Sequence, residues 1–139
     1  MASTERILAI NPGSTSTKIA LYQGKEPLFE QTLRHPQEEL DRFASIGEQQ
    51  PFRRRVILDA LEENGTSLGA IDAVVGRGGL THPVEGGTYK VTEPLLKDLK
   101  RGVLGEHASN LGGILAHALA EEIAGTTDRS EVPSFIVDP

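Results

Sequence analysis

The sequence predicts an α/β fold with a mixed five-stranded sheet flanked by helices. Three observations lead to this prediction. Residues 7–33 contain three short apolar runs separated by turn residues, which is typical of an antiparallel meander. Two helical apolar patterns follow, at 51–63 and 111–123. Each helical pattern precedes a short apolar run, at 71–75 and 134–137, so the chain is expected to cross over to parallel strands.

The composition is that of one ordinary globular domain. The chain has 139 residues, of which 37% are hydrophobic and 24% are charged. A net charge of −6 argues against nucleic acid or an anionic membrane as the main partner. The absence of cysteine excludes disulfides and thiolate metal sites and fits the reducing cytoplasm, where we expect the protein to act. No apolar stretch is long enough to span a bilayer.

The turn between the first two apolar runs carries unusual chemistry for a hairpin. It places an amide, a glycine, hydroxyls and an ammonium close together, in Asn11, Gly13, Ser14, Ser16 and Lys18. Glycine allows a ligand to approach the backbone, and successive N–H groups in such a turn can bind an anion. A Ser/Thr-rich loop without a ligand is the alternative. A Walker loop is a poor fit, because its Gly-x4-Gly-Lys-Ser/Thr spacing is missing and no helical pattern follows.

The next segment is expected to be helical. The third strand is expected at 28–33, and His35 and Pro36 break the pattern after it. A short helix is then expected at 37–43. A stronger helix begins at Pro51 and ends at Asn64 and Gly65.

A basic triplet, Arg53, Arg54 and Arg55, lies in the first turn of that second helix. Such a triplet can indicate nucleic-acid binding. Because Glu48, Asp59 and further acidic residues lie nearby in the sequence, we expect a solvated helix face instead.

The apolar run at 71–75 ends in a glycine-rich stretch that contains Arg77. In open α/β sheets, ligands bind at the carboxyl ends of the strands. The planar guanidinium matches carboxylate and phosphate groups, so Arg77 is a candidate ligand for either, with a solvated loop arginine as the alternative.

The segment from residue 80 to residue 110 is expected to be mostly irregular. An irregular loop leads to a short strand at 88–91, and its His82 and Glu85 are too isolated to indicate a metal site. A short helix is expected at 93–99. Ser109 or Asn110 should then cap the following helix.

The last part of the chain contains two glycines that predict close packing and one carboxylate that is a candidate metal ligand. Gly112 and Gly113 imply that another element packs closely against the first turn of the helix that contains them. The last apolar run ends at Asp138, and a carboxylate at this position of a core strand commonly holds a divalent cation.

Four stretches in this order resemble the acetokinase family, within the acetate and sugar kinase/heat-shock chaperone/actin superfamily. They are LAINPGSTSTK (8–18), IDAVVGRGG (71–79), GEHASNLGGILA (105–116) and PSFIVDP (133–139). Within the family they look like butyrate kinases rather than acetate kinases. Acetate kinases carry His-Asn-Pro where this chain has Glu106, His107 and Ala108, so no role is carried over to His107.

The resemblance implies a ribonuclease H-like, actin-type ATPase domain that takes part in ATP-dependent, reversible phosphorylation of a short-chain carboxylate such as butyrate. It implies nucleotide-phosphate binding by Asn11, Gly13, Ser14, Ser16 and Lys18. It implies that Asp138 and Asn11 hold Mg²⁺ and that Asp138 is catalytic. Arg77 would be catalytic and, with Asn110, would bind the carboxylate substrate.

The resemblance also implies a second domain. Residues 1–139 would form the N-terminal domain, the nucleotide-binding C-terminal half would be absent, and this part alone would be inactive. The expected partners are ATP and a short-chain carboxylate, without nucleic acid or membrane, in a homo-oligomeric enzyme. The alternatives are a single actin-like domain that acts as a binding or scaffold module and a sugar kinase of the same superfamily. Sugar kinases normally use an Asp base and often open with Asp where this chain has Asn11.

Overall fold

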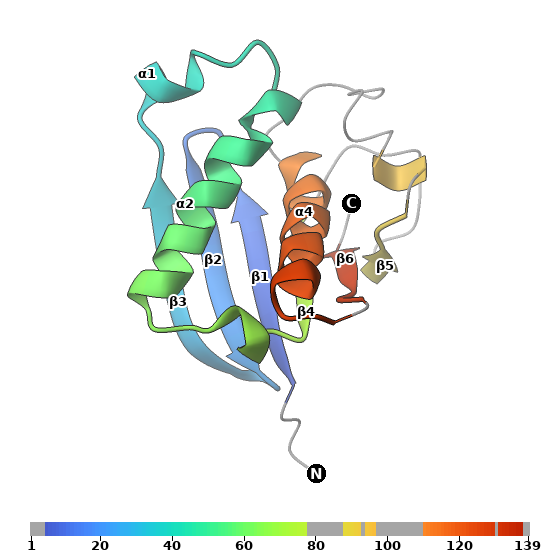
Figure 1. Ribbon diagram of the computed structural model, residues 1–139. Helices are drawn as coiled ribbons and strands as arrows, with labels where there is room; N and C mark the ends of the chain where they lie inside the picture. The colour runs from blue at the N-terminus through green and yellow to red at the C-terminus, as the bar shows by residue number, and fades with distance from the viewer. Residues whose placement is uncertain (1–4, 78–87, 93, 97–109, 130, 138–139) are drawn as a thin grey trace.

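The computed structural model of the protein describes residues 5–77, 88–92, 94–96, 110–129 and 131–137. Within these ranges the strands form one sheet of six, in the order β3-β2-β1-β4-β6-β5 (Figure 1). The strands are β1 (Arg6–Pro12), β2 (Ser16–Gln23), β3 (Glu26–Arg34), β4 (Ala73–Arg77), β5 (Thr88–Lys90) and β6 (Ser134–Val137). The predicted α/β class is confirmed. The sheet has one strand more than predicted, because β5, expected only as an isolated short strand, joins its edge.

The sheet is mixed, as predicted. β1 pairs antiparallel with β2 and parallel with β4, β2 pairs antiparallel with β3, and β4 pairs parallel with β6. β5 pairs antiparallel with β6. The two parallel pairings place the carboxyl ends of β1, β4 and β6 at the same edge, which is where ligands bind in open α/β sheets.

Both long helices lie over the same face of the sheet (Figure 1). They are α2 (Gln50–Glu63) and α4 (Leu111–Thr126). The shorter elements are α1 (Gln37–Leu40) and the 3₁₀ turns η1 (Gly47–Gln49) and η2 (Leu68–Ala70). The predicted start of the second helix is confirmed to within one residue, since Pro51 takes the place in the first turn where its missing N–H costs nothing.

The core lies between this sheet face and the two helices. Side chains alternate along a strand, so Leu8 and Ile10 face the helices whereas Asn11 lies on the other face. The largest buried apolar side chains of this core are Leu8, Ile10, Ile19, Ile57, Leu61, Ile71, Leu111, Leu115, Leu119 and Ile123. Full burial of each contributes roughly 1.5–3 kcal/mol.

Glycine lets α4 lie directly on β4. A Cβ atom built on Gly76 would lie 2.0 Å from the carbonyl oxygen of Gly112, and one built on Gly112 would lie 2.5 Å from the carbonyl oxygen of Arg77. The expectation that another element packs closely against the first turn of this helix is confirmed, and that element is the end of β4. Asn110 occupies the N-cap position, as predicted for it or Ser109, but its side chain makes no capping hydrogen bond. Ser109 lies outside the described ranges.

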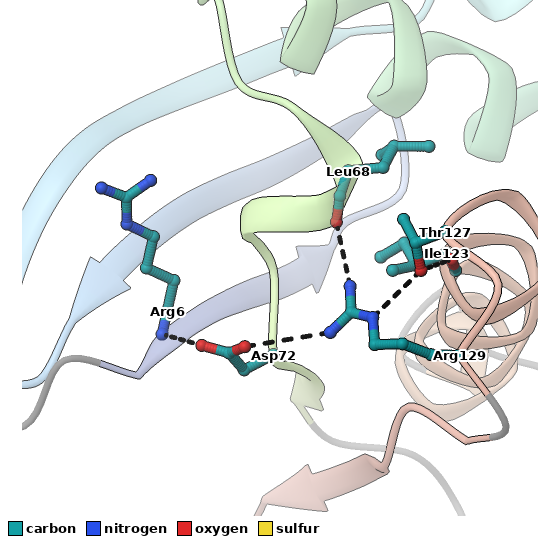
Figure 2. Close-up of polar contacts among 6 residues, drawn as sticks. All are labelled: Arg6, Leu68, Asp72, Ile123, Thr127 and Arg129. Carbon is teal, nitrogen blue, oxygen red and sulfur yellow. Dashed lines mark hydrogen bonds and ion pairs between the residues drawn. The ribbon is translucent and has the colours of Figure 1, made fainter.

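Arg129 ties the end of α4 to the amino ends of the central strands (Figure 2). The Asp72 carboxylate accepts a hydrogen bond from the Arg6 backbone N–H at 2.8 Å and lies 3.8 Å from the Arg129 guanidinium. Arg129 also donates to the Leu68 carbonyl at 3.3 Å and to the Thr127 hydroxyl at 3.0 Å. These contacts lie at the edge opposite the carboxyl ends of β1 and β4, so they are structural.

Several expectations fall partly or wholly on undescribed residues. Of the short helix expected at 93–99, residues 94–96 are helical and 93 and 97–99 lie outside the described ranges. His82, Glu85 and His107 lie outside them as well. Among the helices that the structure describes, none combines the length and apolarity that crossing a membrane requires.

Candidate active site

Asn11, Lys18 and Arg77 meet on the sheet face that α2 and α4 leave open. Asn11 and Lys18 are direct partners in the β1–β2 ladder, and Arg77 ends β4, the other neighbour of β1. All three side chains are exposed and line one hollow of about 260 Å³. Apolar side chains, including Ala9 and Val75, line most of the rest of it, together with Tyr22 and Glu30.

The turn between β1 and β2 adjoins this hollow at the same edge of the sheet. The Gly13 N–H donates to the Ser16 carbonyl at 2.7 Å and closes the turn. Ser14 is exposed, whereas Gly13 and Ser16 are partly buried. The predicted phosphate-binding residues are thus contiguous with Asn11 and Lys18, because Asn11 precedes the turn and Lys18 follows it.

Arg53 holds the turn from the buried side. Its Nη1 donates to the carbonyls of Gly13 at 2.7 Å and Ser16 at 2.9 Å, and its Nη2 donates to the Ser14 carbonyl at 3.0 Å. Nη1 also donates to the Thr17 hydroxyl at 3.2 Å, and Nε donates to Gln49 Oε1 at 3.1 Å. The forked guanidinium can serve several acceptors at once, which an ammonium cannot do in this geometry.

The prediction of a solvated triplet is wrong for Arg53, which is 0% exposed. Burial lowers its pKa to about 10, so the group remains charged at neutral pH. Arg55 is exposed and Arg54 is partly buried. The helical spacing could have predicted this burial. Arg53 lies four and seven residues before the buried Ile57 and Ala60, so all three lie on the helix face that packs inward.

His35 completes the buried polar layer beneath the turn. Its Nε2 lies 2.7 Å from the Thr17 hydroxyl, and its ring packs edge-on against Phe52, with centroids 5.4 Å apart. Burial, and then the positive charge of Arg53, lower the pKa of His35 to about 4. The imidazole is therefore neutral at physiological pH. From the sequence, His35 was predicted only to break the strand pattern before Pro36.

Among the described residues, the predicted substrate ligand Asn110 does not line the hollow. It is buried at the start of α4, at 1% exposure. Its helix nevertheless contacts the Arg77 backbone through Gly112. Asp138 lies outside the described ranges, directly after Val137, which does line the hollow.

The described part of the site suits an anion. Lys18 and Arg77 contribute two positive charges, while Glu30 contributes one negative charge at the far side, where Tyr22 donates to it at 3.4 Å. Among the described residues, no three His, Cys, Asp or Glu side chains lie close enough to hold a metal ion. Metal binding by Asp138 and Asn11 therefore stays a prediction.

No protein-family model matches the chain. It is 52% identical to butyrate kinase 1 of Clostridium acetobutylicum over 134 residues, which are 96% of this chain and 36% of that protein. Probable butyrate kinases from two strains of Clostridium botulinum are 51% identical with the same coverage. The chain thus spans about a third of the length of these relatives.

Solved structures show the same fold at low sequence identity. An acetate kinase from Entamoeba histolytica matches 96% of this chain with 36% of its own, at a TM-score of 0.56 and 14% identity. An exopolyphosphatase from Cytophaga hutchinsonii matches 99% of this chain with 54% of its own, at 0.55 and 12%. A propionate kinase from Francisella tularensis matches 96% with 36%, at 0.52 and 17%. The predicted resemblance to the acetokinase family is confirmed: over 96% of its length, this chain is a homologue of part of the butyrate kinases.

Proposed function

We propose that this chain forms the N-terminal actin-like domain of an enzyme that transfers the γ-phosphoryl group of ATP to a short-chain carboxylate, reversibly, in the cytoplasm. The observation that carries the proposal is the convergence of Asn11, Lys18 and Arg77 around one hollow beside the Gly13–Ser16 turn, in a chain 52% identical to a butyrate kinase. Butyrate or a branched relative is the proposed acceptor.

The charges of the site match the demands of this reaction. Phosphoryl transfer is catalysed mainly by positioning the reactants and by stabilising charge on the transferred group. We propose that Lys18 and the turn residues Gly13, Ser14 and Ser16 bind the nucleotide phosphates. Arg77 would pair with the carboxylate or with the phosphoryl group that it receives, because a guanidinium matches both anions. The carboxylate is already an anion, so no general base is needed.

The position of Val137 supports a cation site at the same edge. Val137 lines the hollow together with Asn11, and the next residue along the chain is Asp138. Carboxylate and amide oxygens are ligands that Mg²⁺ accepts, and we propose that Asp138 and Asn11 hold it. When bound, Mg²⁺ neutralises phosphate charge. Asn110 is proposed to contact the substrate from the start of α4.

A scaffold module is a weaker explanation of this site. A module that works only by docking has no need for two exposed cations, an exposed amide and a turn fixed by a buried arginine around one hollow. The sugar-kinase alternative lacks support because Asn11 stands where an aspartate often opens those enzymes.

The test is the formation of acyl phosphate by the full-length protein. Purified protein, Mg²⁺-ATP and butyrate are incubated with hydroxylamine, which converts an acyl phosphate into a hydroxamic acid and releases phosphate. Ferric chloride added afterwards gives the coloured iron–hydroxamate complex that is measured. Butyrate-dependent hydroxamate and matching release of ADP support the proposal. A folded protein that forms no hydroxamate with butyrate, isobutyrate, propionate or acetate contradicts it.

A further inference from the structure

All four carbonyl groups of the turn, from Gly13 to Ser16, accept hydrogen bonds from the protein. Three of them are bound by the single guanidinium of Arg53, at 2.7–3.0 Å. The fourth, that of Thr15, accepts from the His35 backbone N–H at 2.8 Å. Hairpin turns usually leave such carbonyls to solvent, so this arrangement fixes the orientation of each peptide plane.

Fixed carbonyls also fix the N–H groups. In a trans peptide the N–H of one residue points away from the carbonyl of the residue before it. The Gly13 and Ser14 carbonyls point toward the buried Arg53, so the N–H groups of Ser14 and Thr15 point outward. Ser14 and Thr15 are exposed, and neither N–H has an acceptor within the described part of the chain. Two adjacent N–H groups that point outward from a turn are suited to bind an anion.

Among the described residues, no carboxylate balances the charge of Arg53. Each of its hydrogen-bond acceptors in the described ranges is neutral: backbone carbonyls, the Thr17 hydroxyl and the Gln49 amide. No carboxylate of the described residues lies within ion-pair distance of it. A buried cation with only neutral acceptors is costly, and an anion bound directly in front of the turn would offset part of that cost.

We propose that Arg53 is a positioning residue. Its hydrogen bonds to the turn carbonyls orient the Ser14 and Thr15 N–H groups toward a bound phosphate group, and its positive charge adds to the attraction for that phosphate. The identification of that phosphate as part of ATP rests on the proposed function. The role needs a fork that reaches several carbonyls, which arginine provides and lysine does not.

The test compares the full-length wild-type protein with Arg53→Lys, Arg53→Met and the exposed neighbour Arg55→Met as the matched control. Inorganic pyrophosphate serves as the probe. Its dissociation constant is measured by calorimetry, and the rise in melting temperature that it produces is measured for each variant. In ¹⁵N-labelled wild-type protein, the amide signals of Ser14 and Thr15 are followed during the same titration.

We expect pyrophosphate to shift both amide signals in the wild type. Arg53→Lys should weaken pyrophosphate binding by about tenfold or more, Arg53→Met should abolish it, and Arg55→Met should bind as the wild type does. A purely structural Arg53 would lower the melting temperature of the variants but leave the pyrophosphate affinity of the folded protein unchanged. That result would overturn the inference.

If Arg53→Met does not fold, Arg53→Lys tests the inference by itself, because lysine retains the positive charge but not the fork. Wild-type pyrophosphate affinity in Arg53→Lys also overturns the inference. The outcomes separate the two proposals. If pyrophosphate binding depends on Arg53 but no carboxylate is phosphorylated, the inference stands and the proposed function fails. If butyrate is phosphorylated and Arg53→Lys leaves the KM for ATP unchanged, the function stands and the inference fails.

Discussion

Gly76 of β4 and Gly112 of α4 are in backbone contact, so close that a Cβ atom on Gly76 would lie 2.0 Å from the Gly112 carbonyl oxygen. Gly112 in turn approaches the Arg77 carbonyl, where a Cβ atom would lie 2.5 Å away. The first turn of α4 therefore packs against the backbone of Gly76 and Arg77, the two residues at the end of β4. Arg77 is the residue whose side chain lines the hollow. The two glycines fix the position of a candidate catalytic arginine relative to the helix.

A methyl group at this contact should be poorly tolerated. Gly112→Ala places its methyl against backbone, which cannot move aside as a side chain can, and we expect a loss of stability on the order of 3 kcal/mol. Gly125→Ala, near the end of the same helix, is the control. Nothing lies within 4 Å of a Cβ atom there, so this change should be neutral or stabilise by up to about 1 kcal/mol. Urea unfolding measures both, and equal stabilities would show that the contact is absent.

His35 should make stability depend on pH. Its pKa falls from 6.5 to about 4 on folding, because burial and Arg53 disfavour the charged ring. Above pH 6.5 the ring is neutral in both states, and its contribution is constant. Between pH 6.5 and 4 the unfolded state binds a proton that the folded state does not, so the free energy of unfolding should fall with falling pH, by about 3 kcal/mol in total.

The variant His35→Gln tests this prediction. Its free energy of unfolding, measured with urea, should depend less on pH between pH 7 and 5 than that of the wild type. Identical slopes in the wild type and His35→Gln would show that His35 does not titrate differently on folding.

Much of the fold follows from the sequence, because local signals and tertiary packing agree there. The meander was predicted from three apolar runs, α2 from Pro51 and Asn64, and the close packing of α4 from Gly112. The edge strand β5 was not placed in the sheet, because three residues carry too weak a pattern to indicate a partner.

The candidate site was predicted less completely. The residues around the hollow were recognised because amide, hydroxyl and cationic groups in a glycine-rich turn have few purely structural uses. The layer beneath the turn was missed. Arg53 was interpreted from its basic neighbours, although its partners are carbonyls about forty positions earlier in the chain, which only the folded chain brings to it.

Arg77 should carry much of the catalysis. In the full-length protein, Arg77→Ala should lower kcat for butyrate phosphorylation on the order of 10³-fold or more, because an arginine at the transferred phosphoryl group or its acceptor stabilises charge in the transition state. Arg55→Ala, on the exposed side of α2, should leave kcat unchanged. A folded Arg77→Ala protein with wild-type turnover would remove Arg77 from the reaction.

The acceptor pocket should favour butyrate over acetate. Each additional buried methylene contributes about 0.8 kcal/mol, so the two that distinguish these substrates should raise kcat/KM roughly tenfold. The ratio is measured with both carboxylates competing in one reaction at saturating Mg²⁺-ATP. Equal kcat/KM values would contradict the expected pocket without affecting the assignment of carboxylate phosphorylation itself.

Isotope transfer tests most directly whether this protein phosphorylates a carboxylate. Butyrate labelled with ¹⁸O in both oxygens is incubated with Mg²⁺-ATP and the full-length protein, and the products are followed by ³¹P NMR. Attack of a carboxylate oxygen on the γ-phosphorus leaves ¹⁸O in the bridge between the acyl group and phosphorus. We therefore expect a butyrate-dependent acyl phosphate signal with the small upfield shift that a bound ¹⁸O produces. ATP consumption that does not depend on butyrate, or the absence of any ¹⁸O-shifted acyl phosphate, would contradict the account.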